Sequence, residues 1–331
     1  MAMLRSIAAV GIAKQSGKGA AAAVPAYGFG VMSGNVFQAP ITQVYEAMTL
    51  PGGASDRFSP AVNRTDVVPG AAFKTRLWPS SSGLWLLAAL GTNVDSGPVS
   101  GVYTHTITPA LDVPYLTLFA KLTTGEFEKL PDCKVQEITF TFTERGSIEL
   151  DVVVLGLVPS LSTASWAATV DETVNTYYTP NGGTFLVDAG SNVPAAAQVK
   201  AASVKIGNNL AGVPLSKSVL PDDLVPGQQI VEGTLGLIPN DFGDWKKVLS
   251  TGVAGTVVKE KPVYGSFSLK YQIDANTDLT LAALRVPMLT DFPPADPSGG
   301  PVEVDLSFLV ARPTDASAAF TATDRNTVAT Y

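Results

Sequence analysis

Apolar and polar residues alternate over positions 134–158, and this constrains the fold more than any other feature of the chain. A period of two, with β-branched and aromatic residues on one side, is typical of a half-buried strand. The sequence Glu144-Arg145-Gly146-Ser147 between the two alternating runs is a turn signal, so the segment predicts an antiparallel hairpin. Similar strands are predicted at residues 203–206, 230–237, 265–273 and 302–310. The chain is therefore expected to be mainly β.

Helix signals are scarce by comparison. Residues 80–91 begin with a serine cluster that can supply an N-cap, continue with Leu and Ala, and end at Gly91, which suits a left-handed cap. Residues 240–249 have the same form, with Asp241 near the start, where the helix dipole favours an anion. We therefore predict two short helices.

The two helices belong to a longer internal repeat. The pentapeptide DVVPG at 66–70 recurs as DLVPG at 223–227, an offset of 223 − 66 = 157. Each copy precedes a strand, a proline and a short helix, in which GLW at 83–85 matches GDW at 243–245. A later strand repeats as well, because IELD at 148–151 matches VEVD at 302–305. Landmarks in the same order at nearly constant offset predict a duplicated unit of domain size.

The repeat sets the expected domain boundaries. The first unit covers residues 1–160, the connector residues 161–197 and the second unit residues 198–331. The connector is rich in small residues and turn formers. Residues 37–60 form a long turn-rich arm, and a loop of this length in a compact domain is usually functional or disordered.

Composition points to an oligomer and away from nucleic-acid binding. Hydrophobic residues make up 46% and charged residues 15% of the 331 residues, so much of the surface is neutral, as in proteins that bury surface in interfaces. The net charge is −7 and there is no basic run, whereas gripping DNA requires clustered Lys and Arg against the phosphates. A role in gripping nucleic acid is therefore rejected.

The sequence offers no targeting segment and no cofactor chemistry. One cysteine and one histidine exclude an intrachain disulfide and a Cys/His metal site. The start, MAMLRSIAAVGIAKQSGKG, resembles a signal peptide only faintly, because Lys14 and Lys18 interrupt its apolar run. No stretch approaches the ~20 apolar residues of a membrane helix. We expect a soluble, non-enzymatic protein made in a cytoplasm, with no cofactor, no metal and no membrane partner.

His105 and Cys133 are the two residues whose chemistry might suggest catalysis. His105 lies in a Thr-rich strand without an evident nucleophile or orienting acid, which nucleophilic catalysis needs, so a structural role is favoured. Cys133 stands at a strand start with no discernible partner, and we expect a small buried residue. No catalytic residue is assigned.

Other motifs also have simple structural interpretations. Glu149 with Asp151, and Glu303 with Asp305, are acid pairs on one strand face. Paired carboxylates can serve glycoside hydrolysis or bind Ca²⁺, but acids two residues apart on the outward face of a half-buried strand are ordinary, so a solvated outer face is favoured. The glycines at 17–19 and 182–183 lack the spacing of a phosphate loop. Trp85 and Trp245 are expected to anchor the two helices in the core.

Most of the chain resembles the tail tube proteins of long-tailed, siphovirus-type bacteriophages. The resemblance lies in SIAAVGIAKQSGKGAAAA near the start, in VVPGAAFKTRLWPSSSGLWLLAALG, in the long strand region from VYTHTITP to DVVVLGLV, and in VPGQQIVEGTLGL. It implies two tandem tail-tube-type β-sandwich or barrel units, each with a short flanking helix. It also implies rings that stack into a hollow tube in the virion, through which viral DNA passes without specific binding. We expect the arm at 37–60 and the C-terminal tail, residues 314–331, to make contacts between stacked rings. In such a tube, the alternative to a solvated outer face is that the acid pairs line the channel.

The resemblance and the repeat together suggest an assembly. If each unit fills one of six positions, three chains close a ring with pseudo-six-fold symmetry, because closure counts units and not chains. A six-chain ring with one unit decorating the outside is the alternative. The family further implies a tape-measure protein, a tail terminator and tail-tip proteins as partners. A rival of another class is a carbohydrate-binding or adhesin-like β-sandwich, which predicts a signal peptide and an exposed aromatic cluster, neither of which is evident.

Overall fold

The structure is a computed structural model that describes residues 7–38, 41–45, 62–123, 125–142, 146–167, 178–188, 195–214, 218–239, 264–287, 304–315 and 317–331. These residues form twenty-one strands and one helix, and the strands pair antiparallel. The expectation of a mainly β chain is confirmed. The predicted helix at 240–249, with Trp245, and residue Glu303 lie outside the described residues.

One long sheet joins the two halves of the chain. In sheet order its strands are β3 (Ser33–Gln38), β6 (Gly70–Arg76), β11 (Glu149–Gly156), β10 (Phe127–Phe142), β14 (Ala195–Gly207), β17 (Ile230–Pro239) and β20 (Val304–Leu309). The hairpin predicted at 134–158 is confirmed as β10 and β11. Within the described residues β3 and β20 pair on one side only, so the sheet ends in two open edges.

Two further strand groups pack behind this sheet. The first contains β2 (Tyr27–Phe29), β1 (Ile7–Lys14), β9 (Leu116–Leu122), the first part of β10, and β12 (Leu161–Ser162). The second contains β7 (Gly91–Val99), β8 (Val102–Pro109), β21 (Phe320–Asn326), β19 (Thr277–Pro287), β18 (Tyr264–Asp274) and β13 (Thr179–Asp188), which joins the start of β14. The predicted connector, 161–197, thus contains β12, β13 and the first residues of β14.

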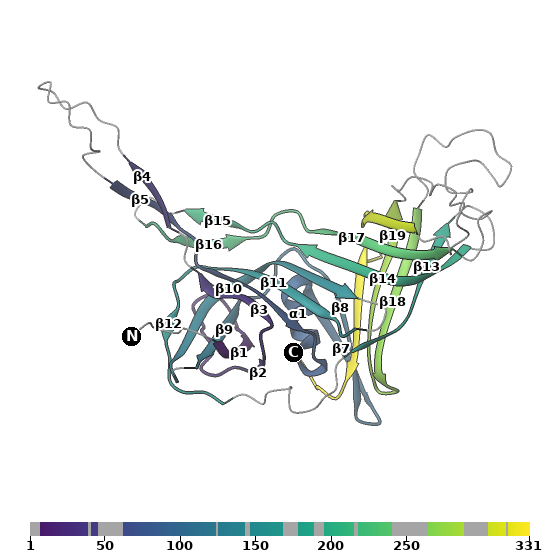
Figure 1. Ribbon diagram of the computed structural model, residues 1–331, viewed down its shortest axis with the longest axis horizontal. Coiled ribbons are helices and arrows are strands. Elements are labelled where there is room, and N and C mark those ends of the chain that lie inside the picture. The colour runs from purple at the N-terminus through teal and green to yellow at the C-terminus, as the bar shows by residue number, and fades with distance from the viewer. Residues whose placement is uncertain are drawn as a thin grey trace, which may run out of the picture.

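Two separate ribbons stand apart from these sheets. They are β4 (Ile41–Tyr45) with β5 (Val62–Val67), and β15 (Ala211–Pro214) with β16 (Pro221–Val225). The described part of the predicted arm at 37–60 includes β4. Figure 1 shows β4 and β5 projecting beyond the body, while β15 and β16 lie over it and point to the same side.

The predicted helix is α1, Pro79–Leu90, and it lies between the sheets. The serine cluster does not cap it: Trp78 occupies the N-cap position, and Ser81 and Ser82 are buried in the first turn. The other end is as predicted, because Gly91 has φ 107° and its N–H donates to the Leu87 carbonyl. Burial of the helix from residue 81 to residue 90 explains its apolar sequence.

The core is continuous through both halves of the chain. Trp85 of α1 contacts Phe29 and Phe73, at ring-centroid distances of 5.6 and 6.0 Å, so it anchors the helix as predicted. Phe142 of β10 stacks on Tyr271 of β18 with centroids 4.2 Å apart. All five belong to one buried cluster that extends to β21. The two halves therefore share a single hydrophobic core.

The C-terminal segment corrects one expectation. Residues 314–331 were predicted to make contacts between rings, but β21 pairs with β19 on one side and with β8 on the other. Phe320 and Ala322 are fully buried in the core. The alternation of apolar and polar residues along β21 explains why this segment becomes an internal strand.

Candidate assembly surface

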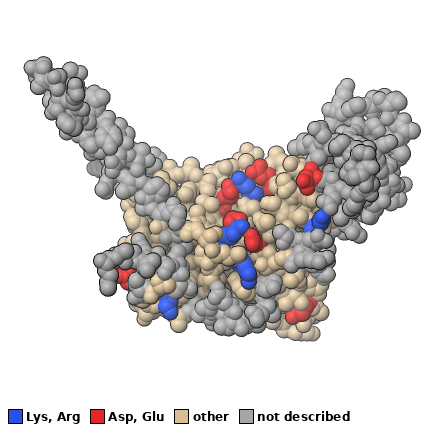
Figure 2. Space-filling model, viewed as in Figure 1, with Lys and Arg blue, Asp and Glu red and all other residues tan. Residues whose placement is uncertain are grey.

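The exposed face of the long sheet carries alternating charges. Successive side chains of a strand point to opposite faces, so the residues opposite the buried ones gather on this face. Figure 2 shows acidic and basic side chains clustered over the middle of the molecule. The charged residues of this face among the described residues are Lys74, Arg76, Glu137, Glu149, Asp151, Lys200, Lys205, Glu232 and Asp305. Four bases and five acids give a charge of 4 − 5 = −1.

Two lysines connect neighbouring strands across this face. The Nζ of Lys74 lies 2.8 Å from Glu149 and 3.8 Å from Asp151, which joins β6 to β11. The Nζ of Lys205 lies 2.9 Å from Glu137 and 3.4 Å from Glu232, so this lysine of β14 connects β10 of the first half with β17.

The ion pairs fix charge positions more than they stabilise the fold. Hydrogen bonds to Glu149 and Glu137, respectively, raise the pKa of Lys74 and of Lys205 above their ordinary value. Each lysine side chain is about one third exposed, at 32% and 37%, so solvent screens the attraction and each pair contributes ~0–1 kcal/mol. The pairs hold both lysines against acidic neighbours on the surface.

The predicted acid pairs are partly accounted for. Glu149 and Asp151 lie on the exposed face and share Lys74, an arrangement of a solvated sheet surface. Asp305 is exposed in β20, while its predicted partner, Glu303, is outside the described residues. The acids were predicted from the sequence, but the lysines between them were not. Alternation along each strand could have identified Lys74 and Lys205, because both occupy outward-facing positions of their strands.

His105 has a structural environment. It is fully buried; its Nδ1 lies 2.6 Å from Asp95, and its Nε2 lies 2.9 Å from the carbonyl oxygen of Val328. Burial raises the pKa of Asp95, but hydrogen bonds from His105 and Asn93 outweigh it and leave the pKa below its ordinary value. Both ring nitrogens are occupied, so the histidine links β7 and β8 to the C-terminal segment.

Cys133 and the glycine motifs are likewise absorbed by the fold. The Cys133 thiol is buried and donates to the carbonyl of Leu116, 3.1 Å away, and burial raises its pKa to about 12. The backbone N–H of Gly19 donates to the carboxylate of Asp132 at 2.7 Å, so a side chain occupies the glycine turn at 17–19. Gly182 and Gly183 lie within β13.

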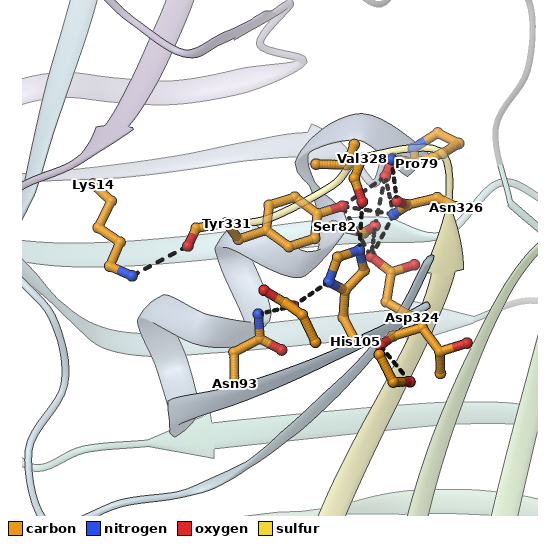
Figure 3. Close-up of polar contacts among 12 residues, drawn as sticks. Lys14, Pro79, Ser82, Asn93, His105, Asp324, Asn326, Val328 and Tyr331 are labelled. Atoms are coloured by element: carbon orange, nitrogen blue, oxygen red, sulfur yellow. Dashed lines mark hydrogen bonds and ion pairs between the residues drawn. The ribbon is translucent and has the colours of Figure 1, made fainter. Parts of the chain in front are cut away.

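A buried polar network lies beside the start of α1 and is centred on Asp324 of β21 (Figure 3). Its carboxylate accepts hydrogen bonds from Ser82 at 2.6 Å, Tyr178 at 2.7 Å, Asn326 at 3.0 Å and Tyr331 at 3.2 Å. Burial raises the pKa of Asp324 to about 6, although the hydrogen bonds from Ser82 and Tyr178 act in the opposite direction. The network ties β21 of the second half to α1 of the first half.

A second polar cluster joins the halves at the DLVPG repeat. The Nζ of Lys134 in β10 lies 2.7 Å from Asp112 and 3.0 Å from the carbonyl oxygen of Leu224 in β16. The hydroxyl of Tyr115 donates a short hydrogen bond to Asp223. That hydrogen bond is the largest effect on Asp223 and lowers its pKa. No local pattern in the sequence predicts this cluster, because its members come from three separate segments.

The candidate residues His105, Cys133 and Gly19 thus occupy structural positions in the fold. In the described residues, no group of three or more His, Cys, Asp or Glu is arranged to hold a metal ion. No helix in the described part of the chain has the length and apolar character that crossing a membrane requires.

Comparison with known protein families identifies the class. A family model described as phage tail tube protein matches residues 6–322. The chain therefore belongs to the phage tail tube protein family: it is a structural component of the virion tail that assembles with itself and with other tail proteins. This is not a family of enzymes. No curated protein matches the chain.

Proposed function

We propose that three copies of this chain close a ring with pseudo-six-fold symmetry and that stacked rings form the hollow conduit for genome delivery. The charged face of the long sheet lines the channel. The proposal has three supports: a recurring set of strand pairings, a sheet that crosses from one half to the other, and two open sheet edges.

Seven strand pairings of the first half recur in the second half in the same chain order and the same antiparallel sense. The corresponding pairings are β1–β2 and β13–β14, β1–β9 and β13–β18, β9–β10 and β18–β19, β10–β12 and β19–β21, β3–β6 and β14–β17, β6–β11 and β17–β20, and β4–β5 and β15–β16. The β10–β11 pairing has no counterpart in the described residues, where β19 and β20 do not pair. The seven shared pairings extend the DVVPG repeat beyond a few motifs and support a duplicated unit. It also assigns β13 to the second unit, which shortens the connector.

The pairing of β10 with β14 is the observation that carries the proposal. In the order of the long sheet, β10 is the last strand of the first unit and β14 is the first strand of the second unit. Their pairing runs from Glu137 opposite Gly207 to Phe142 opposite Ala202. In the described residues β3 and β20 are left open at the two ends of the sheet. A ring in which the open end of one chain pairs with that of the next removes both edges, which would otherwise template aggregation. Around such a ring, the β10–β14 pairing within each chain alternates with a pairing between β20 of one chain and β3 of the next.

The sheet face suits a channel that must release DNA. Among the described residues of this face the acids outnumber the bases, which disfavours binding to phosphates, and carboxylates hold Lys74 and Lys205. DNA passes without specific binding. The tape-measure protein occupies the channel before ejection, and the terminator and tail-tip proteins bind the two ends of the tube.

Native mass spectrometry of purified rings, combined with electron cryomicroscopy of the tubes, tests the proposal. We expect three chains per ring, both halves contributing to the channel wall, and Lys74 and Lys205 facing the channel. Six chains per ring with one half on the outside would support the decorated six-chain ring instead. Dispersed monomers that form neither rings nor tubes would overturn both.

A further inference from the structure

The chain contains the same cation–π pair twice, once in each half. In the first half, the Nζ of Lys134 lies 4.4 Å from the ring centroid of Tyr115. In the second half, the guanidinium carbon of Arg285 lies 4.0 Å from the ring centroid of Tyr264. Each tyrosine stands at the start of a hairpin, β9–β10 or β18–β19, and each cation lies in its second strand. The spacings are similar, 134 − 115 = 19 and 285 − 264 = 21.

The first pair already holds a segment of the other half. Tyr115 donates to the carboxylate of Asp223, and Lys134 donates to the backbone carbonyl of Leu224 at 3.0 Å. The side chain of Lys134 is only 3% exposed, so these contacts are shielded from solvent. Asp223 and Leu224 are the first two residues of DLVPG, and this contact fastens the ribbon β15–β16 onto the first half.

The second pair lacks such a partner within the described part of the chain. There, Arg285 forms no ion pair, and its Nη1 donates a hydrogen bond to the carbonyl of Arg312, 2.9 Å away. The hydroxyl of Tyr264 has no hydrogen-bond partner among the same residues. Both side chains are partly exposed. A guanidinium has five N–H donors, so Arg285 can keep the Arg312 contact and still bind an acceptor.

The counterpart of the bound segment is found in the first half. DVVPG begins with Asp66 and Val67, the equivalents of Asp223 and Leu224, at the end of β5. The N–H of Val67 donates to the carbonyl of Val219, 2.9 Å away, so β5 ends beside the turn of the β15–β16 ribbon. From there β4 and β5 project past the body, on the side to which β15 and β16 point (Figure 1). In a ring, that side faces the second half of the neighbouring copy.

We propose that Tyr264 and Arg285 bind the Asp66–Val67 segment of a neighbouring copy, as Tyr115 and Lys134 bind Asp223–Leu224 within one chain. Tyr264 donates to the Asp66 carboxylate, and Arg285 donates to the same carboxylate or to the Val67 carbonyl. This inference rests on the proposed ring and names the polar contact that closes each junction between chains. Charge complementarity fixes the register there, because a carboxylate buried against a guanidinium tolerates few other neighbours.

A charge exchange tests the contact. Arg285→Glu and Asp66→Arg are each expected to lower the fraction of sedimentable tubes roughly tenfold or more, and the double variant is expected to restore most of it. Arg285→Lys is the matched control, because it keeps the cation and should assemble nearly as wild type. Tyr264→Phe removes one hydroxyl and should weaken assembly less than either charge reversal.

Thermal melting of the unassembled chains establishes that each variant is folded. If Arg285→Glu is not folded, Asp66→Arg in the projecting ribbon carries the test alone. Single variants that polymerise like the wild type, or a double variant no better than the singles, would overturn the contact. If the wild type forms three-chain rings and the variants form tubes as efficiently as the wild type, only the contact between Asp66 and the Tyr264–Arg285 pair is contradicted. Six-chain rings in the wild type would contradict the proposed ring itself.

Discussion

At the residue scale, buried polar groups couple the two halves more strongly than the visible charges of the surface. Lys74 and Lys205 are about one third exposed, and their ion pairs are screened. Asp324 is fully buried and accepts four hydrogen bonds, two of them from Ser82 and Tyr178 in other segments. Losing such an acceptor leaves several buried donors unsatisfied, which is the more expensive defect.

Asp324 makes the stability of the fold depend on pH. Its pKa is about 6 in the folded chain and 3.8 in an exposed reference state, so the folded state binds the proton more tightly. The resulting stabilisation is complete below pH ~4 and is lost as pH rises through 6, about 3 kcal/mol in all. We expect Asp324→Asn to gain stability relative to wild type between pH 4 and pH 7, measured by denaturant unfolding. The exposed Asp315→Asn variant is the control and should show no such gain; a constant difference between Asp324→Asn and wild type would contradict the assignment.

At the scale of elements, α1 contains a glycine that helix propensity does not explain. Gly83 lies in the helix interior, where Ala is favoured by ~1 kcal/mol. A Cβ at this position would lie 2.0 Å from the ring of Tyr331, whose hydroxyl accepts a hydrogen bond from Asn326 at 2.6 Å. The glycine is therefore needed for the close approach of the C-terminal segment to the helix.

Gly83→Ala is expected to lower the free energy of unfolding by roughly 1–3 kcal/mol, because Tyr331 must move. In a Tyr331→Ala background, the same substitution is expected to be neutral or to stabilise by up to ~1 kcal/mol, since only helix propensity remains. A double-mutant cycle of unfolding free energies checks this. A stabilising effect of Gly83→Ala in the wild-type background would show that the contact with Tyr331 is unimportant.

Two long strands allow one element to serve two sheets. β10 pairs with β9 and β12 near its start and with β11 and β14 near its end, and its register with β11 shifts between Val135 and Glu137. β14 pairs with β13 at its start, and its register with β17 shifts between Val199 and Ala201. Such bulges bend a strand and increase its twist, so the same chain segment can leave one sheet and enter another.

At the scale of the whole molecule, the two halves of the chain are joined by strand pairing and by a shared core. β10 pairs with β14, β8 pairs with β21, and one core cluster includes residues of both halves. We expect a single cooperative unfolding transition, followed by both far-UV circular dichroism and tryptophan fluorescence in denaturant. Three of the four tryptophans, Trp78, Trp85 and Trp166, pack in the first half, so the fluorescence is weighted toward that half, while β-sheet ellipticity reports on both.

The contact between halves can be weakened selectively as a control. Asp324→Ala removes the acceptor that joins β21 to α1 and should lower the midpoint for both probes together. Two separate transitions in the wild-type chain would show that the halves unfold independently. Each half expressed alone is expected to be poorly soluble, because separation exposes the edges of β10 and β14.

Local patterns predicted some of the elements. Alternation over residues 134–158 predicted the β10–β11 hairpin, and the apolar run ending at Gly91 predicted α1 almost to its bounds. The capping role of the serines was wrong, because Ser82 is used instead as a donor to Asp324 from a distant strand. The buried placement of His105 and Cys133 agrees with the structural roles that we favoured for them.

What the sequence determined by itself is the class of the protein: its β content, its helix, its internal repeat and its family resemblance all depend on periodicity and short motifs. Only the tertiary structure decided that β10 pairs with β14, that β21 is an internal strand, and that Tyr115 binds Asp223 while Lys134 binds the Leu224 carbonyl. A strand presents the same backbone donors and acceptors to any neighbour. Its partner is therefore chosen by the packing of side chains that lie far apart in the chain, and such packing has no local signature.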